Sequence, residues 1–195
     1  MGVNIPALNA LAADPASADV LEIYDASAGE NKKITHANLC PLRAARASES
    51  GGDYGSTDNA TVTVRFDTLD VDLGSLLSLA SDEFTVSVDC TLVIMVSVQG
   101  YETTNSERGE WKLQAQLDPL GVGSYAAEGP EFSAYGRDVS GVDFRQQVVG
   151  LLIVEATATD KIRFRLTVNT DGGGAWTIDA ANTIVNFFAL PKNAP

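Results

Sequence analysis

Catalytic chemistry in this chain would have to depend on very few side chains. The sequence holds one histidine, His36, and two cysteines, Cys40 and Cys90. Nucleophilic catalysis needs a base beside the nucleophile, and the sole histidine lies outside the part of the chain with dense strand patterning. A structural zinc site needs more ligands than these three residues provide, and no paired Cys-x-x-C spacing is present. The sequence predicts no catalytic residue and no zinc centre.

Carboxylates are abundant, so acidic groupings arise from composition alone. Asp67, Asp70 and Asp72 follow a predicted strand, where such side chains can hold calcium, but a solvated acidic loop is the favoured interpretation. Glu128 and Glu131 have the residue types of a glycosidase pair but lie in a Gly/Pro-rich stretch without a recognisable pocket. We therefore expect no metal, no cofactor and no enzymatic activity.

Net charge and hydropathy exclude two kinds of partner. The formal net charge is -13, which repels phosphates and makes nucleic acid a poor partner. No apolar stretch is long enough to span a bilayer, so membrane insertion is not expected. Residues 1–11 lack the basic start and apolar run of a signal peptide. For a chain made in a reducing cytoplasm, both cysteines are expected to be free thiols.

Strand patterning is dense after residue 59. From Phe84 to Val98, apolar residues recur at every second position, a period that a strand keeps on one face and a helix does not. We expect a bend or turn near Asp89, because this run is long for one strand. Lys161 to Val168 alternates in the same way. These short strands and Gly/Asp/Asn turns predict an antiparallel β-sandwich or jelly roll.

Three segments emerge along the chain. Residues 1–42 are predicted to form an N-terminal arm. Residues 43–58, which are small, polar and rich in Gly and Ser, are predicted to form a flexible linker. Residues 59–195 are predicted to form the jelly-roll domain.

Several predicted strands are apolar on both faces. In a two-layer sandwich only one face of each strand meets the core, so the second face needs a cover. A partner subunit is the favoured cover, and a local loop or the N-terminal arm is the alternative. The residues expected at this oligomer interface are Val93, Met95, Val149, Leu151, Ile153 and Phe187.

A basic stripe lies on one predicted strand. Lys161, Arg163 and Arg165 share one face and, in an acidic protein, will attract carboxylates. Pairing within the chain or solvation is favoured, and pairing with another subunit or with an acidic ligand is the alternative.

The strand pattern resembles that of C1q/TNF-like domains over about residues 60–191. The resemblance is carried by the segment 84–98, by the apolar run 149–153 with the strand 158–166 after it, and by the Gly-rich turn 172–174 before the terminal strand 183–190. Cys90-Thr91-Leu92 stands where the family has an aromatic-Gly-Tyr step. The resemblance implies a jelly-roll fold and a homotrimer.

Residues 18–39 resemble a short module of tailed-phage virion proteins such as fibres and decoration proteins. Locally the segment predicts a small β-hairpin, with strands at 20–24 and 32–35. The resemblance implies that the arm anchors the protein to the major capsid protein or to another virion protein. The residues expected to anchor the arm are Leu21, Ile23, Tyr24, Ile34 and Leu39.

Two functions follow from these features. The first is a non-enzymatic structural protein of a phage virion, assembled in the host cytoplasm as a trimeric capsid decoration (cement) protein or head fibre. The alternative is a tail-fibre adhesin that recognises a host surface glycan. For the adhesin, the glycan is expected to bind to loops at 101–109 and 121–136. These segments hold Tyr101, Tyr125 and Tyr135, whose rings suit stacking on sugars.

Overall fold

The chain divides into two units, residues 1–41 and 42–195, which are described separately. The computed structural model describes residues 20–25, 30–35, 43–102, 108–137, 145–170 and 174–191. Among these residues, no helix is long and apolar enough to cross a membrane. The helical structure in the described part is one 3₁₀ turn, Pro119–Gly121.

The first unit contains the predicted hairpin. Strand β1 (Val20–Asp25) pairs antiparallel with β2 (Glu30–Thr35), and the register places Val20 opposite Thr35 and Asp25 opposite Glu30. The hairpin predicted from the sequence is confirmed.

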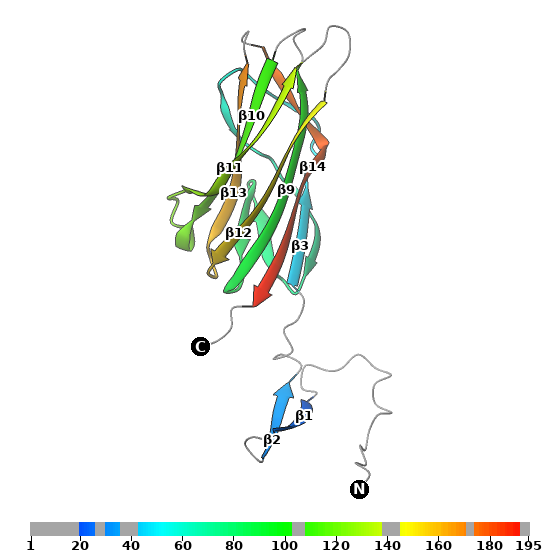
Figure 1. Cartoon of the computed structure of the whole chain (residues 1–195), viewed down its shortest axis with the longest axis vertical. Coiled ribbons are helices and arrows are strands. Elements are labelled where there is room, and N and C mark those ends of the chain that lie inside the picture. The colour runs from blue at the N-terminus through cyan, green and yellow to red at the C-terminus, as the bar shows by residue number, and fades with distance from the viewer. Residues whose placement is uncertain are drawn as a thin grey trace. The chain divides into compact units, whose positions relative to one another are not determined.

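The second unit is a sandwich of two antiparallel six-stranded sheets (Figure 1). One sheet has the order β11-β10-β13-β8-β7, with β5 also paired to β13. The other has the order β12-β9-β14-β3-β6, with β4 also paired to β14. The predicted all-β jelly-roll class is confirmed. The strands are β3 (Arg43–Ser48), β4 (Tyr54–Ser56), β5 (Thr61–Thr63), β6 (Thr68–Leu73), β7 (Leu77–Ala80), β8 (Glu83–Val86), β9 (Cys90–Glu102), β10 (Arg108–Asp118), β11 (Ala126–Arg137), β12 (Arg145–Ala156), β13 (Lys161–Thr170) and β14 (Trp176–Pro191).

Residues 43–58 are not a linker. Strand β3 lies between β14 and β6 in the second sheet, and β4 pairs with β14. Ala45 and Ala47 face the core and are buried, whereas Arg46 points outward. The segment therefore alternates as a strand does. The prediction of a linker is wrong because the inward residues are small, so the composition resembles that of a linker. The sandwich begins at β3.

Aromatic rings fill the core between the two sheets. Phe84 lies at the centre, with its ring centroid 5.3 Å from that of Phe66, 6.4 Å from that of Phe164 and 4.8 Å from that of Phe187. All four side chains are fully buried. Burying a ring of this size stabilises the fold by roughly 1.5–3 kcal/mol, and the tilted contacts add to it. This cluster joins β8 and β13 of one sheet to β14 of the other.

Two tryptophans close the end of the sandwich opposite Arg43. The rings of Trp111 and Trp176 meet edge to face, with centroids 5.0 Å apart. Two inward-facing glycines provide the space for them. A Cβ atom at Gly100 would lie 2.1 Å from the Trp111 ring, and one at Gly109 would lie 2.2 Å from the Trp176 ring.

Gly100→Ala should therefore destabilise the protein by about 1–3 kcal/mol, because the added methyl group forces the indole or the backbone to move. Gly55→Ala is the matched control, since its Cβ would meet no atom closer than 3.4 Å. Urea denaturation of both variants measures the difference. Equal stability of the two variants would contradict this packing.

Candidate interaction surface

The second sheet turns an apolar face away from the core. Its strands alternate, so odd-numbered residues of β9 and β12 and even-numbered residues at the end of β14 point outward. The register places Ile153 beside Val93, Val93 beside Phe188, and Phe188 beside Ala44. Ala44 in turn lies beside Leu73 of β6. One row of apolar side chains thus crosses five strands.

Two further rows lie next to this one. Leu151 pairs with Met95, and Val149 pairs with Ser97, which also neighbours Ile184. With strands about 4.8 Å apart and same-face residues about 6.8 Å apart, the rows cover on the order of 400 Å². A patch of a few hundred Å² is among the largest that monomeric soluble proteins expose, and such patches are often functional. The exposed large hydrophobic residues of this face are Val71, Leu73, Met95, Val149, Leu151, Ile153, Phe188 and Leu190.

Most of the interface residues expected from the sequence lie on this face. Val93, Met95, Val149, Leu151 and Ile153 point outward, and Ile153 is 66% exposed. Their contact with a partner subunit stays a prediction.

Phe187 was assigned to the wrong face. It is fully buried and belongs to the aromatic core, whereas Phe188 is 43% exposed. Both parities of this strand are apolar, so alternation could not decide which one faces inward. The register decides it, because β14 carries a bulge against β9 between Asp179 and Ile184. Val71 and Leu73 of β6 also lie on this face, and the alternation of Leu69, Val71 and Leu73 is the signal for them in the sequence.

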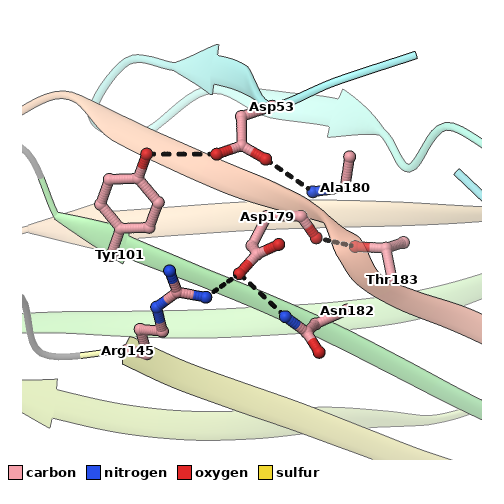
Figure 2. A network of polar contacts seen from close by, with 7 residues as sticks. All are labelled: Asp53, Tyr101, Arg145, Asp179, Ala180, Asn182 and Thr183. Atoms are coloured by element: carbon pink, nitrogen blue, oxygen red, sulfur yellow. Dashed lines mark hydrogen bonds and ion pairs between the residues drawn. The ribbon is translucent and has the colours of Figure 1, made fainter. Parts of the chain in front are cut away.

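A polar network occupies the end of this face opposite Arg43 (Figure 2). Asp179 is 4% exposed, and its carboxylate accepts hydrogen bonds from the Arg145 guanidinium and the Asn182 amide. The Arg145 side chain is half exposed and lies over the Tyr101 ring, 5.8 Å from its centroid. Removing one partner of such a pair leaves the other charge poorly solvated, which is costly.

The same network holds the bulge of β14. The Asp53 carboxylate accepts hydrogen bonds from the Tyr101 hydroxyl (3.2 Å) and the Ala180 backbone N–H (3.0 Å). The buried Thr183 hydroxyl donates to the Asp179 carbonyl oxygen at 2.9 Å. At this point the neighbour of β14 changes from β4 to β3. These bonds therefore satisfy backbone groups that have no partner in the sheet at the bulge.

Glu49 is a buried carboxylate at the end of β3. It is 7% exposed, and its Oε1 accepts a hydrogen bond from the Gly51 backbone N–H, while Oε2 has no partner. Burial, followed by the nearby Asp67 and Asp82 carboxylates, raises the pKa of Glu49, and the Gly51 bond and the Arg65 charge oppose this. The ionised form is therefore less favourable in the folded state than in the unfolded chain.

Glu49→Gln should consequently stabilise the protein at pH 7, because the amide keeps an oxygen for Gly51 and removes the buried charge. A gain of about 1 kcal/mol would raise Tm by roughly 2–4 °C. The folded-state pKa lies above the usual value of 4.5, so the penalty in the wild type is present above the folded-state pKa and is relieved as the pH falls through it. The gain should therefore shrink toward pH 4.

Thermal melts from pH 4 to pH 8 test this pH dependence. The exposed Glu131→Gln, which removes the same charge from the surface, is the control, and we expect its effect on Tm at pH 7 to be small. A pH-independent gain for Glu49→Gln would show that the buried charge is not its cause.

Asp67, Asp70 and Asp72 lie just before and within β6, and each of them has a partner within the chain. Asp67 accepts hydrogen bonds from the Ser50 backbone and hydroxyl, both at 2.9 Å, and Asp72 accepts one from the Leu76 backbone N–H at 2.7 Å. Asp70 lies 3.6 Å from the Arg46 guanidinium. Among the described residues, no group of three or more His, Cys, Asp or Glu side chains is placed to hold a metal ion.

The remaining residues singled out in the sequence do not come together in one site. Cys90 is buried, and Glu131 lies 4.0 Å from Lys112. The segment around Tyr135 is strand β11 and not a loop, and Tyr101 lies in β9.

Several predictions fall in or beside the first unit. Of the expected anchoring residues, Leu21, Ile23 and Tyr24 lie in β1 and Ile34 in β2. Leu39, His36 and Cys40 lie outside the described residues. The anchoring role stays a prediction.

Comparison with known proteins shows the fold alone. No protein-family model and no curated protein matches the chain. Among solved structures, Eiger TNF from S. frugiperda superposes with a TM-score of 0.52 at 12% identity, covering 80% of this chain and 96% of that one. Murine APRIL at pH 8.0 gives 0.54 at 10% identity, covering 76% and 99%. The expected TNF-like jelly roll is confirmed.

Proposed function

We propose that this protein is a non-enzymatic structural subunit that forms a homotrimer through the outward face of the β12-β9-β14-β3-β6 sheet. The observation that carries the proposal is the apolar row from Ile153 through Val93 and Phe188 to Leu73, which nothing else in the described sandwich covers. Burial of such a face against protein gives the free energy that association needs.

The apolar face is the part of this acidic chain that a second copy can approach with the least repulsion. With a net charge of -13, two copies repel one another wherever carboxylates would meet. The apolar rows avoid this repulsion, since the ion pair that borders them, Arg46 with Asp70, is internally balanced. The number three follows from the resemblance to C1q/TNF-like domains, and the TNF-like fold supports it.

Leu151→Glu should convert the trimer to a monomer, because it would bury three added carboxylates per trimer among apolar side chains. Val122→Glu is the matched control, since Val122 is an exposed apolar residue in the β10–β11 turn, away from this face. Light scattering with size-exclusion chromatography measures the mass of each protein. A stable wild-type monomer at micromolar concentration would refute the proposal.

As its biological setting we propose a phage virion, where the trimer would serve as a capsid decoration protein or head fibre. The resemblance of residues 18–39 to a module of virion proteins supports this setting, and the major capsid protein or another virion protein would then be the partner. A two-stranded hairpin such as β1–β2 is only marginally stable alone, so packing on a neighbour would complete it.

Deletion of residues 1–42 should leave a folded trimer that no longer attaches to particles, because the sandwich begins at Arg43. Co-sedimentation with virus particles that lack the protein measures attachment, and circular dichroism checks the fold. Particle binding that survives the deletion would show that the arm is not the anchor.

A further inference from the structure

The outward face of the other sheet carries the basic stripe on β13. Lys161, Arg163 and Arg165 occupy alternate positions on this face, with Gln116 and Gln114 of β10 as cross-strand neighbours of the two arginines. This face belongs to the β11-β10-β13-β8-β7 sheet, so it is separate from the face proposed for trimerisation.

The lysines of this sheet are neutralised by carboxylates within the chain. Lys161 Nζ lies 3.2 Å from Glu83 Oε2. Lys112 Nζ lies 3.3 Å from Glu110 and 4.0 Å from Glu131. For Lys161, the expectation of pairing within the chain is confirmed.

The two arginines are held by neutral groups instead. Arg163 donates through Nε to the Gln116 side-chain oxygen at 2.8 Å, and its guanidinium lies 3.6 Å from the centroid of the Tyr125 ring. Arg165 donates to the Thr63 hydroxyl and to the Thr61 carbonyl oxygen, each at 2.9 Å. In the described part of the chain, neither arginine forms an ion pair with a carboxylate.

These contacts fix both guanidinium groups while leaving donors available. A guanidinium has five N–H donors, and the hydrogen bonds described above engage one on Arg163 and two on Arg165. Residues two apart on a strand lie about 7 Å apart, close enough for one oxyanion to contact both side chains. Arginines held before the ligand arrives lose little side-chain entropy on binding. Glu83, which pairs with Lys161, also interacts electrostatically with Arg163.

We propose that Arg163 and Arg165 bind the carboxylate or phosphate group of an acidic saccharide. Guanidinium groups match both oxyanions with paired hydrogen bonds. A chain with a net charge of -13 repels a continuous polyphosphate such as nucleic acid, whereas a saccharide with isolated anionic groups meets only the local stripe. Thr61, Thr63 and the Gln114 side chain border the site with neutral polar groups that suit sugar hydroxyls.

The experiment is a titration of the full-length protein, labelled with ¹⁵N, with sodium D-glucuronate, glucose 6-phosphate, inorganic phosphate or neutral D-glucose. The arginine Nε–H resonances report on the site directly. We expect glucuronate, glucose 6-phosphate or both to shift the Arg163 and Arg165 signals with a millimolar Kd, and glucose to leave them unchanged. Which saccharide binds distinguishes a carboxylate site from a phosphate site.

Two single-charge variants test specificity. Arg165→Gln should weaken binding at least tenfold. Lys112→Gln removes the same charge from the same sheet, but one that carboxylates already neutralise, so it should change binding less than twofold. Light scattering of both variants checks that the oligomer is unchanged.

Three outcomes would overturn the proposal. The first is that neither acidic sugar shifts the Arg163 and Arg165 signals. This outcome includes the case in which inorganic phosphate alone shifts them. Another is equal weakening by both variants, which would indicate diffuse charge attraction. The third is tighter binding of a single-stranded oligonucleotide than of an acidic oligosaccharide. None of these results depends on trimer formation or on particle attachment, so the proposed function would be judged separately.

Discussion

The register of β14 is the constraint on which the arrangement of this sandwich depends. This strand pairs with β9 along nearly its whole length, while β3 and β4 share its other edge. Its bulge, held by Asp53 and Thr183, sends Phe187 into the aromatic core and Phe188 outward. A shift by one residue would exchange the two faces, because side chains alternate with a period of two. The bulge therefore sets both the core and the apolar outward face.

The outward faces of the two sheets differ in the kind of side chain that they expose. One presents apolar rows in which the charge of Arg46 is balanced by Asp70. The other presents charged side chains, with lysines balanced by carboxylates and two arginines held by neutral groups. The proposed association and the proposed saccharide binding use different sheets, so they would not compete on one subunit. A jelly roll permits this because both of its sheets have a solvent-facing side.

Sequence patterning predicted those features that depend on local alternation. The break near Asp89 separates β8 from β9, and the hairpin β1–β2 forms where expected. Patterning failed where the inward and outward residues of a strand do not differ clearly in hydrophobicity. The inward residues of β3, Ala45 and Ala47, are too small to indicate a strand, and β14 has apolar residues at both odd and even positions. The pairing of Arg145 with Asp179 could not be predicted either, because it depends on the pairing of β12, β9 and β14.

Stability is unevenly distributed along the sandwich. The end opposite Arg43 contains three buried polar atoms without partners in the described part of the chain, namely Nε1 of Trp111, Nε1 of Trp176 and Oε1 of Gln146. Each such atom forfeits roughly 1–3 kcal/mol of the hydration it had in the unfolded chain. The end at which β3 begins has apolar rows and the Phe84 cluster instead. Local opening should therefore begin at the polar end, while the strands that carry Ile153, Val93 and Phe188 stay paired. The face proposed for association thus lies on the more stable part of the sandwich, so a loss of order at the polar end need not separate the subunits.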